Sequence, residues 1–493
     1  MKPIIKFLCI ILSCTILFSL TGCSDTKDAY IYFELTETPK TLDPQIASTD
    51  TELLIIKNIH EGLMRENDKG EIVCGMAESY ERDGLTYSFK LRKNAKWSNG
   101  DKITADDFQF AFLRALSPDT NAPFASRLMC IKGASEYNSG ATNSLSGVTA
   151  NNDTVTITLN YDDEQFLKTL TTAICMPCNQ EFFNESKGKY GLFADNIISS
   201  GSYKLTRWRK ETFGIRLYDN DDYNGFAVAK NSAVFITCNK DEPIIDKISS
   251  DKIDMAFIDA ALTDKAHSLN IETKEFNNIV WFLTIGKDFS EPMRKSFTLL
   301  TGKEIYSSSL PVGYTAATSV YPDILTENPI LNGYTQYNLE AGKELYLNEL
   351  GNLPDKKFPN DVVLYYYDDG YVKNVVTDIV AHWQNNLSTF INIEAVSSPE
   401  ILNTQLTDQT YRMALFPIRA DSKNIKEYLD NFGVQYDGGG LDTLQEQLLK
   451  GNKIVPIMTQ NTVIAYSNEL SDVVAENGNG YIDFSYIIKD KDK

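Results

Sequence analysis

The order of strand-like and helix-like segments in the second half of the chain constrains its fold more than any other feature of the sequence. Val362–Tyr367 is an uninterrupted apolar run of strand length, and in residues 371–390 the apolar side chains recur at the spacing of one helix face. The segments are, in order, a strand over Val362–Tyr367, a helix over 371–390, a strand over Ile391–Val396, a helix near 399–407 and a strand over Tyr411–Phe416. A strand–helix–strand order implies parallel pairing with right-handed crossovers, so this region is predicted to be an α/β sheet.

The length of the chain sets how many such units it contains. Single hydrophobic cores stop growing near about 250–300 residues, and this chain has 493. Alternating apolar residues mark further strands at Tyr203–Leu205, Ile215–Leu217 and Val234–Ile236, within a strand-rich stretch over 178–285. We therefore expect two α/β lobes, with an extra block inserted into the first.

The inserted block is predicted to combine strands with a helix. Residues Tyr87–Leu91 and Val155–Leu159 alternate between apolar and polar side chains, as strands do. Thr104 and Asp107 form a predicted N-cap pair for a helix that runs to about Leu116. The block is therefore expected to have an α+β fold.

The N-terminus has the layout of a secretion signal. Two lysines, Lys2 and Lys6, precede a run of 14 mostly apolar residues, Phe7–Leu20. A helix needs about 20 apolar residues to span a bilayer, so this run fits a signal peptide better than a membrane span. The run ends in Leu20-Thr21-Gly22-Cys23, which resembles the lipobox of bacterial lipoproteins.

The lipobox resemblance implies cleavage after Gly22 and attachment of diacylglycerol to the thiol of Cys23. Residues 1–22 are then the signal peptide, and residues 23–29 are the lipidated cysteine and a polar tether. Acyl chains stabilise membrane attachment by about 0.8 kcal/mol per buried methylene, so two or three chains anchor a protein firmly. The mature chain is expected at the cell membrane, on its extracytoplasmic face, held there by this lipid.

The charge of the chain argues against one large class of partners. The formal net charge is −20 and the isoelectric point is about 4.7. A nucleic-acid-binding protein carries a basic surface, so no nucleic-acid partner is expected. A strongly acidic domain is also not expected to adhere to an anionic membrane through its own surface.

The sequence offers no motif for catalysis, for a cofactor or for a metal. Its three histidines, His60, His267 and His382, are scattered and do not form an HExxH or a comparable ligand pattern. It contains no GxSxG, no P-loop and no GxGxxG. We therefore predict that the protein is not an enzyme and needs no cofactor or metal, although composition does not exclude a hydrolase that uses two carboxylates.

The cysteines leave two alternatives open. Eight occur in the chain, and five are left once the signal and Cys23 are set aside. Cys175 and Cys178 have CxxC spacing, but a redox pair normally opens a helix in a thioredoxin-like unit and a zinc site needs a second pair. These two residues are therefore expected to be buried thiols or a local disulfide.

Six motifs between residues 41 and 108 resemble those of one known family. They are Thr41-Leu-Asp-Pro44, Asn58-Ile-His-Glu-Gly-Leu63, Ala77-Glu-Ser-Tyr80, Asp83-Gly-Leu-Thr-Tyr-Ser-Phe-Lys-Leu-Arg92, Ala95-Lys-Trp-Ser-Asn-Gly100 and Thr104-Ala-Asp-Asp-Phe108. Together they resemble the family 5 extracellular solute-binding proteins, the oligopeptide-binding lipoproteins of ABC importers. Looser similarity continues to about residue 470.

The resemblance implies a periplasmic-binding-protein-like type II clamshell, with two α/β lobes joined by a hinge and an extra inserted α+β domain. It places lobe I over residues 30–60, 178–282 and 466–493, the extra domain over 61–177, and lobe II over 283–465. Members of the family hold a peptide between the lobes as an added extended strand, whose backbone hydrogen bonds give affinity that does not depend on sequence. The expected function is to capture a small peptide outside the cytoplasm and deliver it to the permease of an ABC importer.

The resemblance also implies which residues bind the peptide. An aspartate of the family binds the free ammonium group of the ligand, and Asp421 stands at its place in this sequence. The other predicted ligand contacts are Pro417 and Arg419 on the same segment, Ser48, Thr49 and Asp50 on the opposite lobe, and the aromatic Phe124.

The segment around Asp421 departs from the family pattern. Ile418 replaces a tryptophan and Ser422 replaces a tyrosine, whereas Ala420 and Asp421 are kept. Pro417 has no N–H, so it cannot donate a backbone hydrogen bond to a ligand. Other interpretations therefore stay open: a non-peptide ligand such as a metal chelate or glutathione, a signalling peptide, a degenerate clamshell with a sensory or structural role, or a surface hydrolase.

Overall fold

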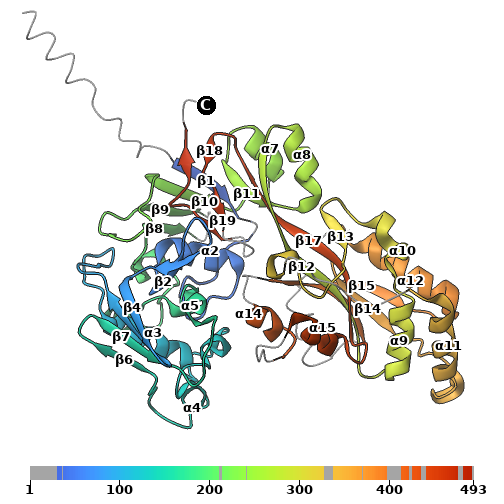
Figure 1. Ribbon diagram of the computed structural model, residues 1–493. Helices are drawn as coiled ribbons and strands as arrows, with labels where there is room; N and C mark the ends of the chain where they lie inside the picture. Colours follow the sequence, from blue (N-terminus) through green and yellow to red (C-terminus); the bar gives the residue numbers. More distant parts are fainter. Residues whose placement is uncertain are drawn as a thin grey trace, which may run out of the picture.

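The structure is a computed structural model that describes residues 30–35, 37–209, 214–239, 241–326, 337–368, 370–396, 412–420, 425–434, 440–475 and 481–490. These residues form two lobes that share one large sheet, and a smaller domain lies beside the first lobe (Figure 1). No helix among them is long and apolar enough to cross a membrane.

The large sheet has 11 strands in the order β15-β14-β16-β12-β17-β11-β1-β10-β9-β8, with β13 paired to β17 outside this path. The strands of lobe I are β8 (Tyr203–Arg209), β9 (Gly214–Asp219), β10 (Ala233–Thr237), β1 (Tyr30–Glu34) and β11 (Met255–Ile258). Those of lobe II are β13 (Tyr314–Ala316), β14 (Val363–Tyr367), β15 (Asn392–Val396) and β16 (Met413–Arg419). The remaining two, β12 (Glu272–Ile285) and β17 (Ile454–Tyr466), belong to both lobes.

Strands β12 and β17 run side by side from one lobe to the other. They pair with each other, and β17 also pairs with β11 of lobe I while β12 pairs with β16 of lobe II. Their register shifts between Asn277 and Ile279, so Asn278 forms a bulge. The side-chain oxygen of Asn278 accepts hydrogen bonds from the N–H and the hydroxyl of Thr462, at 3.3 and 2.8 Å. Because a bulge bends a strand pair, it marks the connection between the lobes.

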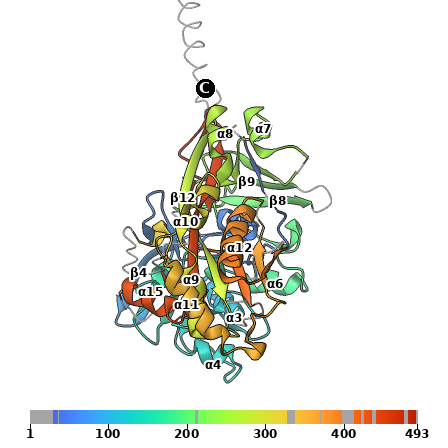
Figure 2. The ribbon, with the colours of Figure 1, turned by 90° about the vertical axis from the view of Figure 1, so that its right-hand side faces the viewer.

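Lobe II combines parallel strands with helices on both faces. β14 pairs in parallel with β15 and with β16, which confirms the predicted parallel α/β order. Helices α9 (Glu291–Leu299), α11 (Leu339–Leu350) and α12 (Lys373–Leu387) cover one face and lie together in Figure 2. Helices α14 (Ile425–Asp430) and α15 (Leu441–Leu449) cover the other.

Lobe I is completed by the last part of the chain. Helix α2 (Asp50–Ile59) shares its core with C-terminal residues such as Phe484, whereas α7 (Ile244–Ser249) and α8 (Thr263–Ser268) pack on the other face of the sheet. Figure 1 shows the C-terminal segment in red close to β1. The segment forms the short pairs of β18 (Leu470–Ser471) with β21 (Ile488–Lys489) and of β19 (Val474–Ala475) with β20 (Ile482–Asp483). The helix expected near 399–407 lies outside the described residues.

The smaller domain has a hydrophobic core of its own. Its antiparallel sheet has the order β4 (Ala77–Asp83), β5 (Thr86–Leu91), β7 (Thr154–Thr158) and β6 (Val148–Asn151). Helix α3 (Ala105–Leu116) begins at the predicted capping box of Thr104 and Asp107. Trp97 and Phe108 are fully buried in the core.

Of the two alternatives for Cys175 and Cys178, the structure shows the first: they are buried thiols and not a disulfide. No disulfide joins the five described cysteines, and Cys175 and Cys178 are both buried. The sulfur of Cys178 accepts a hydrogen bond from Arg114 at 3.4 Å. Burial raises the pKa of the Cys178 thiol to about 12, so it is protonated and unreactive near neutral pH.

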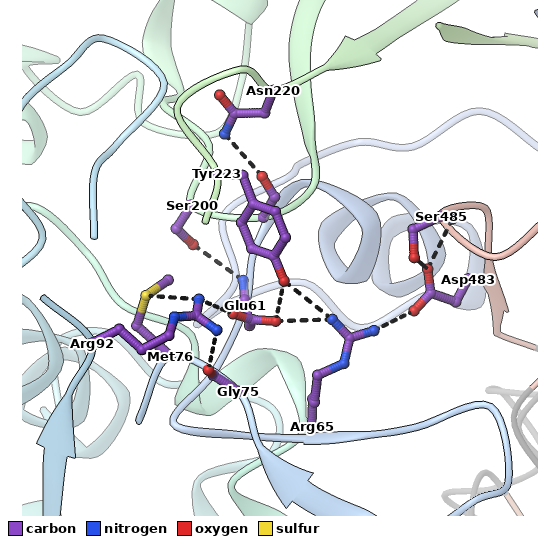
Figure 3. A network of polar contacts seen from close by, with 11 residues as sticks. Glu61, Arg65, Gly75, Met76, Arg92, Ser200, Asn220, Tyr223, Asp483 and Ser485 are labelled. Atoms are coloured by element: carbon purple, nitrogen blue, oxygen red, sulfur yellow. Dashed lines mark hydrogen bonds and ion pairs between the residues drawn. The ribbon is translucent and has the colours of Figure 1, made fainter. Parts of the chain in front are cut away.

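A buried ionic network ties the smaller domain to lobe I and to the C-terminal segment (Figure 3). The carboxylate of Glu61 is only 4% exposed, and it accepts hydrogen bonds from Arg65 at 2.9 Å and from Arg92 at 2.6 Å. The hydroxyl of Tyr223 in lobe I donates to the same carboxylate at 2.5 Å. Arg65 also donates to Asp483 at 2.7 Å. Two carboxylates thus balance two guanidinium groups, as burial of charge requires.

His60, at the end of α2, makes the stability of this junction depend on pH. The side chain is 2% exposed, and its Nδ1 lies 3.3 Å from the hydroxyl of Ser200. Burial lowers the pKa of His60 from 6.5 to about 3. Below pH 6.5 the unfolded chain therefore binds a proton that the folded chain does not, and stability falls by about 1.4 kcal/mol per pH unit until the folded pKa is reached.

A His60→Gln variant is expected to lack this contribution, since glutamine is uncharged at every pH and can still bond to Ser200. In urea unfolding, the parent protein should lose stability relative to the variant as the pH falls below 6.5, the ordinary pKa of the side chain. His267→Gln changes an exposed histidine and is the matched control. A parent and a His60→Gln variant with parallel pH profiles would rule out a neutral, buried His60.

Candidate functional site

A cleft of about 770 Å³ lies between the two lobes. Ligand sites usually measure about 300–1,000 Å³, so the cleft has the size of a ligand site. Its lining includes Ser48, Thr49, Asp50, Phe257, Ile258 and Asp259 of lobe I, Tyr367, Pro417, Ile418, Arg419 and Asn431 of lobe II, and Trp281 of the shared strand β12. The two groups face each other across the β12–β17 connection, and they contain five of the seven predicted ligand contacts.

The start of helix α2 fixes one wall of the cleft. Thr49 caps the helix, and its hydroxyl accepts a hydrogen bond from the N–H of Glu52 at 3.4 Å. The buried carboxylate of Glu52 accepts the backbone N–H of Ser48 at 3.0 Å and that of Thr49 at 3.2 Å. These two amides are therefore occupied, so a ligand that contacts Ser48 or Thr49 must use their carbonyl or hydroxyl oxygens.

The end of strand β16 forms the opposite wall, and one of its edges has no neighbouring strand within the described part of the sheet. β14 pairs with β16 only as far as Leu415, whereas β12 pairs with it as far as Arg419. The N–H of Ala420 donates to the carbonyl of Asn278 on β12 at 2.8 Å. Successive residues of a strand direct their backbone groups to opposite edges, so those of Arg419 and Pro417 point to the outer edge.

Beyond Leu415, no described strand pairs with this outer edge. An unpaired edge presents N–H and C=O groups that act as a template for an added chain. Pro417 supplies only its carbonyl there, because it has no N–H. A ligand strand on this edge therefore forms one hydrogen bond fewer than it would with another residue at 417.

One ion pair spans the cleft. The guanidinium group of Arg419 on β16 contacts the carboxylate of Asp50, the first residue of α2. The side chain of Asp50 is 53% exposed and that of Arg419 is 25% exposed. Ion pairs of such exposure contribute only about 0–1 kcal/mol. The pair thus brings the lobes together weakly, and a charged group of a ligand can replace either partner.

An aromatic pair belongs to the apolar lining of the cleft. The rings of Trp281 and Tyr367 stack with their centres 6.0 Å apart, and the N–H of Trp281 donates to the side chain of Gln460 at 2.8 Å. Trp281 is fully buried, so these contacts hold it in one orientation. Apolar walls with a few fixed polar groups are typical of ligand sites.

The charged groups of the cleft are already bonded to the protein. Lys265 forms an ion pair with Asp246 at 3.0 Å, and Asp259 accepts the N–H of Ala261 at 2.8 Å. The described lining contains neither histidine nor cysteine, and no group of three potential metal ligands occurs among the residues the structure describes. The arrangement is equipped to hold a molecule by hydrogen bonds and apolar contact.

Three predicted residues do not appear in this lining. Cys23 and Asp421 lie outside the described residues, although Asp421 directly follows Ala420 at the end of β16. Phe124 packs between the cores of the smaller domain and lobe I, with the guanidinium carbon of Arg127 4.1 Å from its ring centre. Phe124 is not among the residues that line the cleft, and its contact with a ligand stays a prediction.

The part of the cleft that β12 and β17 provide was not predicted from the sequence. Trp281 and Gln460 belong to no recognised motif, and they are 179 positions apart. In the structure, each of these two strands is longer than the strands around it, with 14 residues for β12 and 13 for β17. Strands of that length can cross from one lobe to another.

Comparison with known proteins identifies the family. A family model described as "Bacterial extracellular solute-binding proteins, family 5 Middle" matches residues 71–440, well over half of the chain. The chain belongs to this family. Its members are solute-binding proteins rather than enzymes, which agrees with a cleft built for binding.

Two curated relatives of this family 5 protein come from Bacillus subtilis (strain 168). The oligopeptide-binding protein OppA is 28% identical over 435 residues, which cover 82% of this chain and 77% of that protein. The dipeptide-binding protein DppE is 30% identical over 268 residues, or 50% of this chain and 49% of that protein. The second alignment thus spans about half of each chain.

Comparison with solved structures shows that the shared fold extends over nearly the whole chain. OppA of Burkholderia pseudomallei has a TM-score of 0.78 at 19% identity, with 94% of this chain and 99% of that chain covered. The complex of Haemophilus influenzae OppA with RPPGFSPFR has a TM-score of 0.77 at 19% identity, with the same coverage. The predicted fold is therefore confirmed: a periplasmic-binding-protein-like type II fold of the α/β class.

Proposed function

We propose that this chain is the substrate-binding lipoprotein of an ABC importer, which captures a peptide between its lobes and delivers it to the permease. The observation that carries the proposal is the outer edge of β16, which ends in the cleft opposite the start of α2. A peptide strand that pairs with this edge contacts both lobes at once. The names of the relatives, an oligopeptide-binding and a dipeptide-binding protein, support a peptide as the ligand.

Delivery follows from a shift between open and closed states. A ligand that touches both lobes stabilises the closed state by the contacts it makes only there. The weak Arg419–Asp50 pair lets the lobes separate when the cleft is empty. In this proposal Asp421 binds the ammonium group of the peptide, Arg419, Pro417, Ser48, Thr49 and Asp50 line its path, and Phe124 adds an aromatic contact.

Attachment through Cys23 completes the proposal. It places the protein on the extracytoplasmic face of the cell membrane, where an importer collects its substrate. The proposed bounds are 1–22 for the signal and 23–29 for the tether. Those of the folded parts are 30–60 with 178–282 and 466–493 for lobe I, 61–177 for the extra domain and 283–465 for lobe II; the separate cores support them.

Calorimetric titration tests the proposal. Tri- to pentapeptides with free amino ends are expected to bind saturably, at one peptide per protein. The constituent free amino acids are the control, since they lack the backbone that pairs with a strand edge. Absence of saturable peptide binding would favour the degenerate clamshell. Cleavage of the peptides during the titration would favour the hydrolase.

A further inference from the structure

One face of the lobe I sheet is unusual because it exposes aromatic rings. Tyr30 and Tyr32 of β1 are 42% and 41% exposed. The register places Tyr32 beside Phe235 on β10, and Phe235 beside Arg216 on β9. Tyr218 follows on the same face of β9, since alternate residues of a strand share a face. We call Tyr30, Tyr32, Phe235, Arg216 and Tyr218 the aromatic face.

The rings of the aromatic face contact one another. Phe235 lies at its centre, with ring centres 5.4 Å from Tyr30, 5.2 Å from Tyr32 and 6.3 Å from Tyr218. No described residue bonds to the hydroxyls of Tyr30 and Tyr32. The face therefore combines a continuous apolar patch with exposed hydroxyls, which is the character of tyrosine at a membrane–water interface.

Positive charge accompanies these rings. The guanidinium group of Arg216 lies 5.4 Å from the ring centre of Phe235, is exposed, and forms no ion pair with the described residues. Arg207 on β8 stands opposite Arg216 in the sheet. Two further lysines at the border are balanced by carboxylates: Lys204 by Asp221 and Lys489 by Asp254. The aromatic face is thus locally basic in a protein whose net charge is −20.

The position of the face in the chain points to what covers it. Tyr30 is the first described residue, and only residues 24–29 separate it from Cys23. At about 3.3–3.6 Å per residue, this tether holds Tyr30 within about 25 Å of the lipid on Cys23. The strands β1, β10, β9 and β8 also lie on the side of lobe I away from lobe II (Figure 1). Contact at this face leaves the cleft unobstructed.

We propose that the aromatic face docks on the anionic lipid surface in which Cys23 is anchored. The proposal rests on the lipid attachment proposed above. Tyrosine rings enter the interface, and Arg216 and Arg207 approach the phosphates of the headgroups. The tether raises the effective concentration of lipid surface to the millimolar range, as a short flexible linker does. A low intrinsic affinity of the aromatic face for lipid is therefore enough for docking. The net charge of the whole chain argues against such contact, but docking depends on the local charge of one face.

Vesicle sedimentation of a chain that begins at Ser24 tests the docking without the lipid. Such a chain keeps every described residue. It is expected to sediment with vesicles of phosphatidylglycerol and phosphatidylcholine at low salt, and less with phosphatidylcholine alone. Arg216→Glu reverses one charge and is expected to weaken the partition by roughly 10-fold or more. The double variant Tyr30→Ser, Tyr32→Ser should weaken it to a similar extent.

Control variants distinguish binding through this face from nonspecific adsorption to vesicles. Phe390→Ser removes an exposed ring of lobe II and should leave the partition unchanged. If the tyrosine variant fails to fold, Arg216→Glu decides, because its side chain is exposed. The proposal would be overturned if the chain did not sediment with anionic vesicles, or if both variants left the sedimentation unchanged. Binding of soluble polyphosphate to this face in preference to vesicles would also overturn it. Labelled palmitate tests Cys23 separately: its absence from the full chain would reject the anchor without changing the vesicle result.

Discussion

The Asp421→Asn variant is expected to bind a peptide with a free amino end about 30-fold or more weakly than the parent protein. In the proposed site, the carboxylate of Asp421 pairs with the ammonium group of the peptide. Closing the lobes removes water from both charges, and removal of one partner then leaves the other buried and uncompensated. Such a loss costs about 2–5 kcal/mol. Calorimetry with a single tripeptide measures it.

An N-acetylated peptide turns this experiment into a double-mutant cycle. Acetylation removes the ligand charge, so Asp421→Asn should change the affinity of the acetylated peptide much less than that of the free one. Asp361→Asn, at a carboxylate of lobe II whose side chain is 68% exposed, is the matched control. Equal losses of affinity for both peptides would show that Asp421 does not bind the ammonium group of the peptide.

The Glu61→Ala variant is expected to lower the free energy of unfolding by about 3–5 kcal/mol. The Glu61 carboxylate accepts from Arg65, Arg92 and Tyr223. Without it, Arg92 has no carboxylate partner within the described network, and Asp483 is the one carboxylate there that Arg65 keeps. Guanidinium groups that are only 12% and 15% exposed, and that lack full compensation, account for the loss. Urea unfolding followed by circular dichroism measures the change.

Exposed glutamates of the same domain provide the comparison. Glu78→Ala, on the solvent side of β4, removes a carboxylate of the same size and should change stability by less than about 0.5 kcal/mol. The Glu61→Gln variant keeps the shape of the side chain and loses only its charge, so an intermediate loss is expected. A Glu61→Ala variant as stable as Glu78→Ala would show that the network does not stabilise the junction.

Local patterns of the sequence predicted most of the fold. Thr104 and Asp107 mark the start of α3. They are predictable because the two residues that bond to each other in a capping box lie within one helical turn in the sequence. The strands near Val363 and Asn392 pair in parallel as their spacing predicts. Signals of this kind depend only on residues that are close together in the sequence. A single sequence therefore contains all of the information that they need.

The cleft was less predictable because it depends on residues far apart in the chain. Ser48 and Pro417 came from the family resemblance, and both line the cleft. The resemblance did not predict that Glu52 occupies the amides of Ser48 and Thr49, since that depends on the exact path of the backbone. Trp281 carries no sequence signal, because its stacking partner Tyr367 is brought to it only by the sheet.

The contacts between the two ends of the chain also set when the protein can finish folding. Asn58 donates to the carbonyl of Ile482 at 2.8 Å and accepts the N–H of Phe484 at 2.9 Å, across more than 400 positions. Lobe I therefore cannot close its interior while the last residues are still on the ribosome. Contacts of such separation slow folding and leave apolar surface open in the meantime. A chain that loses its final dozen residues is expected to be recognised as incomplete and degraded, even though its cleft residues are all present.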